Sequence, residues 1–401
     1  MAQRPPVNDW STDFDHTDLR WIENPFPIWD DLRQRCPMAQ TERFGGVYLP
    51  TRYSDVRAIA YDTDNFSSRR PVIRENSPTV GLPSPPITSD PPHHKPARML
   101  LLPAFTPQAI ARLETRTRQI CNELIDAIAD APACDAAAAY TQHIPVRVIA
   151  YMLGVPEEEG DRFRRWIHVF LEDTIVDDDK MAAERLLGTA NEMDDFFRPY
   201  TEARRADPGD DLISFLLQAK HEGQPLTERH LFGALRLILI AGIDTTWSAI
   251  GASLWHLART PADRARLAGD PGLIPTAVEE FLRAYAPVTM ARQVVSDVEV
   301  GGCPMKAGRL VLLSFPAANR DPAVFNNADQ VIIDRQDNRH AAFGLGIHRC
   351  IGSNLARMEM TVALEEWLRR IPEFRLDDAR AVAWSRGPVR GPRSLPFVLG
   401  T

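Results

Sequence analysis

Cys350 is the residue of this chain whose type and surroundings are best suited to chemistry. It belongs to segment 343–352, which reads FGLGIHRCIG and places one cysteine among three glycines. Glycine permits backbone conformations with positive φ and allows another molecule to come close to the main chain. Residues 351–367 show apolar side chains at helical spacing, so Cys350 is expected where a loop enters a helix. The positive end of the helix dipole and the free N–H groups there favour a thiolate.

The sequence leaves three interpretations of Cys350. Most free cysteines are small buried hydrophobic residues. A catalytic nucleophile would need a base, and the sequence does not show where one lies. The third interpretation is a ligand of haem iron, because a thiolate held by an open loop is suited to binding a metal.

The pattern F-G-x-G-x-H-x-C-x-G in residues 343–352 resembles the cysteine-ligand loop of the cytochrome P450 family, the haem-thiolate monooxygenases, and every fixed position is filled. The resemblance implies that Cys350 binds the iron of haem b, an iron protoporphyrin IX, and that Phe343 packs beside the thiolate. His348 and Gly352 complete the cofactor-binding loop. Thiolate donation would push electron density onto the iron and favour O–O cleavage.

An acidic residue within an apolar helix is the second candidate for chemistry. The pattern predicts a long helix over residues 227–259, with Thr227 as its N-cap and a middle that is apolar nearly all round. Asp244 and Thr245 lie in that middle, where a carboxylate is costly unless it is paired or functional. A threonine in the middle of a helix can bond the i−4 carbonyl, and Gly242 weakens the helix nearby. We therefore predict a local opening of the helix there.

Residues 241–246 read AGIDTT and resemble the oxygen-activation motif of the same family. The resemblance implies that Asp244 relays protons from solvent and that Thr245 stabilises the reduced dioxygen. Cleavage of the O–O bond needs two protons in a site that is otherwise dry, and a poised acid with a hydroxyl suits that task. On local grounds alone, a helix kink with a salt-bridged aspartate is the alternative.

Basic side chains form the third candidate. His94 and Arg98 are four residues apart on a predicted helix, so both face the same way and suit a dianionic group. An exposed basic pair is the alternative interpretation. The stretch D-P-P-x-H-x-x-x-R resembles the one that holds the haem propionates in the family, which implies this role for His94 and Arg98. By the same resemblance, Arg292 is a third propionate donor and His348 a fourth.

Glu280 and Arg283 match the E-x-x-R pair of the family, which is structural rather than catalytic. Their i,i+3 spacing brings the acid and the guanidinium together on one helix face. The family often closes this network with an arginine, where this chain has Gln330. Either Arg335 or Arg320 substitutes for it, or the network is smaller.

The substrate pocket is less clearly marked, because apolar residues on a helix belong to a core more often than to a pocket wall. By family position, an apolar pocket would be lined by part of the long loop 67–88 and by Leu237, Ile240, Ala241, Val288, Met290 and Val389. Arg69, Arg70 and Arg74 in that loop are expected to face solvent, with binding of a substrate carboxylate as the alternative.

Length and composition set the frame for these candidates. The chain has 401 residues, 44% of them hydrophobic, and shows no repeat or Gly/Ser linker. A net charge of −8 argues against nucleic acid as a partner. Five cysteines without a CxxC pair fit a reducing compartment. The apolar run 231–243 is too short to span a bilayer, so we expect a cytoplasmic protein without a membrane partner.

The family resemblance runs from about Asn24 to the C-terminus, with its motifs in order. It implies a single cytochrome P450-type domain over residues 24–401 after an N-terminal extension of residues 1–23. The expected fold class is mostly α with a minor β region, the latter built from short alternating segments such as 298–300 and 310–313. The haem would lie between the long helix and the helix after the cysteine loop.

The implied reaction inserts one atom of O₂ into a C–H bond of a small, largely apolar organic molecule. Because no phosphate-binding glycine motif marks a flavin domain, electrons are expected from a separate ferredoxin and its reductase. A cationic docking patch for that partner, or equally a set of ordinary surface arginines, is provided by Arg112, Arg339, Arg349 and Arg357. Alternatives are a haem-thiolate peroxygenase or other non-hydroxylating oxidative enzyme of natural-product biosynthesis, and a non-catalytic haem sensor.

Overall fold

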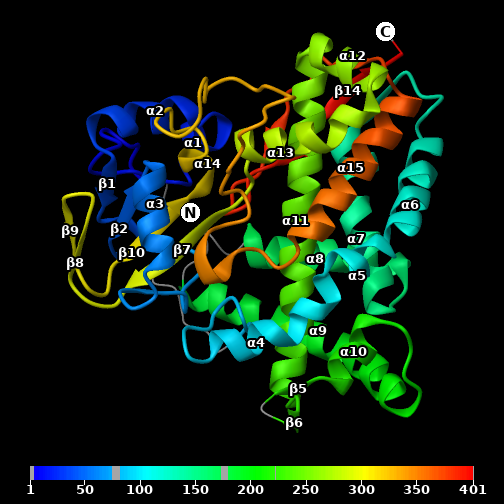
Figure 1. Ribbon diagram of the computed structural model, residues 1–401, viewed down its shortest axis with the longest axis horizontal. Coiled ribbons are helices and arrows are strands. Elements are labelled where there is room, and N and C mark those ends of the chain that lie inside the picture. The colour runs from blue at the N-terminus through cyan, green and yellow to red at the C-terminus, as the bar shows by residue number, and fades with distance from the viewer. Residues whose placement is uncertain (1–3, 75–81, 173–178, 222, 401) are drawn as a thin grey trace.

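One long helix, α11 (Glu228–Arg259), runs through the middle of the molecule (Figure 1). The computed structural model describes residues 4–74, 82–172, 179–221 and 223–400. α11 begins where the sequence predicts, because the Thr227 hydroxyl accepts a 3.3 Å hydrogen bond from the backbone N–H of His230. The predicted mostly α fold with a minor β region is confirmed.

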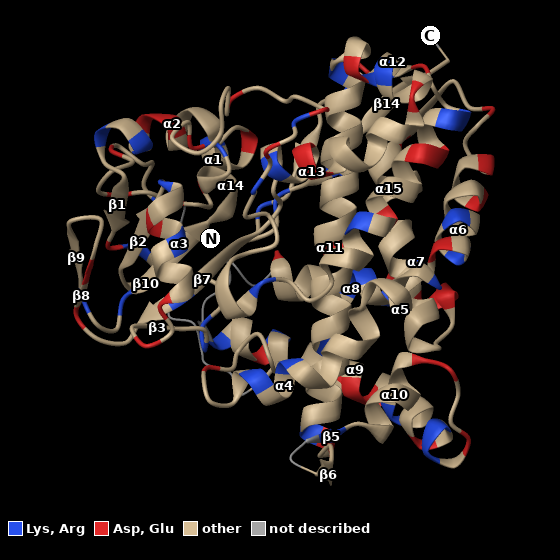
Figure 2. Cartoon of the chain, in the orientation of Figure 1, with Lys and Arg blue, Asp and Glu red and all other residues tan. Residues whose placement is uncertain are grey.

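The remaining helices pack their apolar faces around α11 or cover the smaller β region. The helix bounds are α1 (Leu19–Glu23), α2 (Phe26–Arg35), α3 (Tyr53–Tyr61), α4 (His94–Leu101), α5 (Pro107–Ala111), α6 (Glu114–Asp126), α7 (His143–Leu153), α8 (Gly160–Leu171), α9 (Asp179–Ala206), α10 (Leu212–Gln218), α12 (Pro261–Gly269), α13 (Ile274–Ala284), α14 (Phe315–Ala318) and α15 (Ser353–Arg370). In Figure 1, α6, α7 and α15 lie on one side of α11, and most strands lie on the other side together with α1, α2, α3 and α14. Charged residues are frequent on outer elements such as α2 and α6 (Figure 2).

The β region is organised around a five-stranded sheet of order β1-β2-β10-β7-β3, in which only the β2–β10 pair is parallel. Its inner strand β10 (Leu310–Ser314) is buried along its whole length, as expected for a strand covered on both faces. The other strand bounds are β1 (Met38–Thr41), β2 (Val47–Pro50), β3 (Phe66–Ser67), β4 (Ala133–Asp135), β5 (Lys220–His221), β6 (Gln224–Pro225), β7 (Thr289–Val294), β8 (Val298–Val300), β9 (Cys303–Met305), β11 (Phe374–Leu376), β12 (Ala383–Trp384), β13 (Pro392–Ser394) and β14 (Pro396–Leu399).

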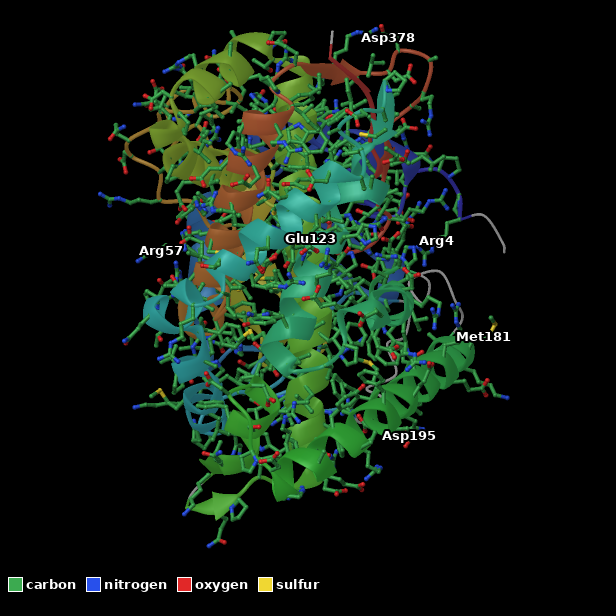
Figure 3. The ribbon with its side chains drawn as sticks, turned by 90° about the vertical axis from the view of Figure 1, so that its right-hand side faces the viewer. Arg4, Arg57, Glu123, Met181, Asp195 and Asp378 are labelled. Atoms are coloured by element: carbon green, nitrogen blue, oxygen red, sulfur yellow. The ribbon has the colours of Figure 1, made fainter. Side chains whose placement is uncertain are left out.

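α11 is a core helix although it is apolar enough to resemble a membrane span. Among the described residues it is the single helix with the length and composition to cross a membrane, with a mean hydropathy of 1.5 in its apolar window. That window is 72% buried inside the protein. Seen from the helical side (Figure 3), α6, which carries Glu123, lies in front of α11, and α9, marked by Met181 and Asp195, lies below.

The opening predicted at Gly242 is wrong, because α11 is helical without interruption from Glu228 to Arg259. The Thr245 hydroxyl does donate to the Ala241 carbonyl, at 2.8 Å, but this bond leaves the helix intact. Gly242 serves close packing instead. A Cβ atom at that position would lie 2.9 Å from the Cδ1 atom of Ile149 on α7.

Glu280 and Arg283 on α13 form a fully buried ion pair, with Arg283 Nε 2.8 Å from Glu280 Oε2. The Arg283 guanidinium also donates to the backbone carbonyls of Asn319, Ala328 and Gln330. Arg335 closes the network on the other side of the acid, with its Nε 2.9 Å from Glu280 Oε2. Of the two arginines that the sequence left open, Arg335 therefore takes the place of the usual third member, and it holds the segment before the cysteine loop to α13.

Glu359 on α15 is a buried acid of a different kind. Neither carboxyl oxygen has a hydrogen-bond partner among the described residues, and the residue is fully buried. Burial raises the pKa of Glu359 well above its ordinary value. The folded protein therefore holds a proton on Glu359 that the unfolded chain releases near pH 4.5, so its stability falls as the pH rises above that value.

We expect Glu359→Gln to remove this pH dependence, because the amide is neutral and has nearly the same shape. The free energy of unfolding of the variant should rise relative to that of wild type by about 1.4 kcal/mol for each pH unit above 4.5 over which Glu359 stays protonated in the folded protein. Thermal melts at pH 5 and pH 8 test this, with the gain expected at pH 8. Glu202→Gln, an exposed position on α9, is the control. Equal melting temperatures of Glu359→Gln and wild type at pH 8 would contradict the expectation.

Candidate functional site

The cysteine loop holds its shape through two glycines with positive φ. Gly344 has φ 72° and Gly346 has φ 69°, a region that favours glycine over other residues. Gly346 also has no room for a side chain, since a Cβ atom there would lie 2.4 Å from the carbonyl oxygen of Ala60 on α3. The loop closes on itself where the Cys350 N–H donates to the Phe343 carbonyl at 2.7 Å. These contacts fix the direction in which the cysteine side chain points.

Cys350 lines a cavity of about 430 Å³, and the surface that it exposes faces this cavity. α15 begins only at Ser353, so the sulfur lies further from the helix start than the sequence predicted. Burial raises the pKa of the Cys350 thiol, while the Gly352 N–H and the guanidinium of Arg98 act in the opposite direction. The helix start is therefore not enough to make a thiolate, and a bound metal cation would supply the missing stabilisation.

Four basic side chains meet at one edge of the same cavity. His94 and Arg98 come from α4, Arg292 from β7 and His348 from the cysteine loop, and Arg98, Arg292 and His348 line the cavity. The rings of His94 and His348 are 4.4 Å apart, and His348 Nε2 lies 2.8 Å from the Ser68 hydroxyl. Burial, followed by the charges of Arg292 and Arg98, lowers the pKa of His348 to about 3.

Asp244 lies on α11 behind the cavity wall, and Thr245 lines the cavity. Asp244 is buried and pairs with Arg393 of β13, with 2.8 Å between the carboxylate and the guanidinium. Burial raises the pKa of Asp244, and Arg393 lowers it in part. Arg393 also binds Glu172 at 2.5 Å and donates to the Ser248 hydroxyl at 3.1 Å. The sequence alternative was a salt-bridged aspartate at a helix kink, and the ion pair is present. Asp244 is nevertheless adjacent in the chain to Thr245, which lines the cavity.

The cavity brings most of the predicted site residues together. All six of the predicted apolar wall positions line it, and so do Phe343, Thr245, Cys350 and Gly352. Asp244 and His94 do not line it directly. Asp244 precedes the cavity-lining Thr245 in the chain, and the His94 ring lies against the ring of the cavity-lining His348. In the loop 67–88, residues 75–81 lie outside the described residues, while Arg69, Arg70, Val72 and Arg74 belong to the wall.

Comparison with known proteins decides the family. The cytochrome P450 family model matches residues 47–269 and 273–380. The chain is 37% identical to the mycinamicin IV hydroxylase/epoxidase of Micromonospora griseorubida, over 92% of this chain and 94% of that protein. It is also 37% identical to the nocardicin C N-oxygenase of Nocardia uniformis subsp. tsuyamanensis, over 91% of each chain. The chain belongs to the cytochrome P450 family.

The fold agrees with this assignment to the cytochrome P450 family. The solved structure of CYP109E1 from Bacillus megaterium in complex with testosterone superposes with a TM-score of 0.86 at 32% identity, covering 94% of this chain and 98% of that one. CYP101J2 superposes with a TM-score of 0.87 at 28% identity over the whole of both chains. The protein is therefore an enzyme, a haem-dependent monooxygenase.

The residues of this P450 fit a haem group. Arg98 has no hydrogen bond or ion pair from its guanidinium to any described residue, and the buried His94 Nε2 is also without a partner there. Arg292 is buried, which lowers its pKa to about 10, and it donates to the neighbouring Ala291 carbonyl. A cluster of buried cations that lacks an anion is unstable alone. Two propionate groups would supply the charge that these donors lack.

Two contacts of this P450 site could not be found from the sequence. Arg393 pairs with Asp244 from 149 residues further along the chain, and Ser68 meets His348 across 280 residues. No local motif marks either residue. The expectation that Arg70 and Arg74 face solvent is wrong, because both are half-buried in the cavity wall.

Proposed function

We propose that this P450 inserts one oxygen atom of O₂ into a C–H bond of a small, largely apolar organic molecule. The observation that carries the proposal is the cavity that has Cys350 in one wall and Thr245, backed by the buried Asp244, in another. The apolar wall residues favour a ligand bound by burial of apolar surface. The test is NADH consumption coupled to formation of a hydroxylated product in the presence of a generic ferredoxin and its reductase. NADH consumption without product from any apolar compound would contradict the proposal.

Haem b, held by Cys350 at its iron, supplies the dioxygen chemistry, which thiolate donation promotes. We infer that the haem propionates are bound by His94, Arg98, Arg292 and His348. The basic side chains and Cys350 would together fix the orientation of the cofactor in the cavity. Phe343, whose ring lies 4.5 Å from the Arg357 guanidinium, would shield the sulfur from solvent.

Proton delivery is the task that we assign to Asp244 and Thr245. The Asp244 carboxylate would take up a proton from the surface side and pass it to the cavity side, where the Thr245 hydroxyl would hold and donate it. Glu172 and His168 would lead from this site toward solvent, while Arg393, which keeps its protons, binds the carboxylates of both Asp244 and Glu172. His168 lies 3.5 Å from Glu172 and is about half exposed, with 52% of its side chain accessible.

Asp244→Asn is expected to lower the rate of product formation about 100- to 10,000-fold, because the amide keeps the hydrogen bond but cannot relay a proton. Arg393→Gln should raise the pKa of Asp244, since a neutralising charge is lost, and move the acidic limb of the pH–rate profile to higher pH. Stopped assays of product between pH 5 and 9 measure both effects.

Asp194→Asn is the matched control for these variants. Asp194 lies on α9 and, like Asp244, forms an ion pair that involves α11, in this case with Arg236, but it does not line the cavity. Its rate should stay within about twofold of wild type, as expected for a substitution away from the site. An Asp244→Asn variant as active as Asp194→Asn would refute the relay.

The electron donor in this proposal is a separate ferredoxin that docks on the face with the cysteine loop. Arg349 and Arg112 are exposed there. Arg357 is bound to Glu279 at 2.5 Å and is therefore less available to a partner. Electrostatic docking predicts that the reduction rate falls with rising salt. We further propose a cytoplasmic location, because all five cysteines are free.

A further inference from the structure

Three arginines of the loop 67–88 line the cavity, and two of them, Arg70 and Arg74, are half-buried there without a role in the chemistry described above. Arg70 and Arg74 both line the cavity, and each has a buried Nε atom with no hydrogen-bond partner among the described residues. Arg74 donates from its terminal nitrogen to the Phe170 carbonyl at 2.6 Å. Burial lowers the pKa of Arg74 to about 10, a value at which the side chain is still charged at neutral pH. A charge is therefore held within a mostly apolar space.

Several buried arginines of this protein are neutralised, whereas Arg74 is not. Arg283 and Arg335 share the carboxylate of Glu280. Arg264 is bound to Glu373 at 2.8 Å. Arg292 and Arg390 also lack an ion pair among the described residues, but Arg292 lies with the basic side chains assigned to the haem and Arg390 does not line the cavity. Arg74 forms no ion pair with any residue in the described part of the chain, although burying an unpaired charge is costly. An anion that enters the cavity would remove this cost.

The haem propionates are not the anions that Arg74 would bind. Their donors come from α4, β7 and the cysteine loop. Arg74 instead contacts the last turn of α8, where Phe170 and Leu171 line the cavity. The same cavity is also lined by apolar residues of α11 and of the segment after α13, among them Leu237, Ile240, Val288 and Met290. Such a cavity suits a molecule with an apolar body and one anionic end.

We propose that the substrate is an apolar carboxylic acid whose carboxylate is bound by Arg74, with Arg70 as a second donor. This inference rests on the proposed function and names the substrate class for it. A guanidinium presents two parallel N–H groups to a carboxylate, and such charge-assisted pairs are about twice as strong as neutral hydrogen bonds. Binding at one end would also fix which carbon of the apolar body lies near the iron.

Calorimetric titration of the haem-loaded ferric protein tests this without any turnover. The probes are decanoic acid and 4-butylbenzoic acid, each compared with its methyl ester, which keeps the shape and removes the charge. We expect the acids to bind at least about 10-fold more tightly than the esters. Arg74→Gln should weaken binding of the acids about 10- to 100-fold and change ester binding less than about twofold. Arg70→Gln should have a smaller effect of the same kind.

Arg52→Gln is the control, because Arg52 carries the same charge but is exposed and does not line the cavity. It should leave the preference for acids unchanged, and Arg74→Lys should keep part of it. Circular dichroism melts show whether each variant is folded. Equal binding of acids and esters by wild type, or equal losses for both ligands in Arg74→Gln, would overturn the carboxylate site. A selective acid site without product formation would leave this inference standing and count against the proposed reaction.

Discussion

Cys350→Ala is expected to abolish haem-thiolate chemistry in this protein. The side chain faces the cavity and would supply the protein's bond to the iron, so alanine removes that bond without disturbing a packed core. Loss of an outer-sphere partner already costs metal sites about 10- to 100-fold in affinity, and loss of the ligand itself should cost more. We expect the affinity for haem to fall at least about 100-fold and turnover to fall to background.

The measurements are haem content per chain and the absorbance spectrum of the purified protein. Cys350→Ser separates loss of the sulfur from loss of any ligand, because an alcohol oxygen can still approach the iron but donates less electron density. Cys303→Ala is the control, since Cys303 lies in β9, outside the cavity wall. Unchanged haem content and absorbance in Cys350→Ala, with far-UV circular dichroism like that of wild type, would refute the role assigned to this sulfur.

The parts of the site that could be predicted are those whose members lie close together in sequence. Residues 343–352 fold into one loop because two of their glycines adopt positive φ. Asp244 and Thr245 share one helix, whose start is set by the local Thr227 cap. Local propensity and spacing act over a few residues, so a motif of this size carries its own geometry.

The parts that could not be predicted depend on tertiary packing. Nothing near Asp244 indicates that Arg393 neutralises it, since β13 reaches α11 only through the fold of the C-terminal region. The opening predicted at Gly242 also ignored tertiary packing, since Gly242 lies close to Ile149 of α7 within a continuous helix. Arg74 was expected in solvent, since arginines usually are exposed. Its burial follows from the approach of α8, which the loop sequence does not encode.

Arg283→Leu is expected to have the largest effect on stability. It leaves Glu280 fully buried with Arg335 as its remaining guanidinium partner, and it leaves the carbonyls of Asn319 and Ala328 without their donor. Removing one partner of a buried ion pair typically costs about 3–5 kcal/mol. We expect a loss in this range here, because Arg335 replaces only part of the two-bond pairing that Arg283 makes with Glu280. Urea unfolding followed by circular dichroism should show a loss of that size, with haem loss at lower urea concentrations than in wild type.

Arg35→Leu provides the matched comparison, because Arg35 and Asp31 form an exposed pair on α2 with side chains 59% and 45% accessible. Exposed pairs contribute only about 0–1 kcal/mol, so this variant should unfold close to wild type. Arg335→Leu should fall between the two, since the 8% exposed Arg335 shares the same acid but Arg283 remains to neutralise it. If Arg283→Leu and Arg35→Leu unfolded at the same urea concentration, the buried ion pair would contribute no more to stability than the exposed one, and the prediction would be wrong. The expected order ties the stability of the segment before the cysteine loop to one buried carboxylate on α13.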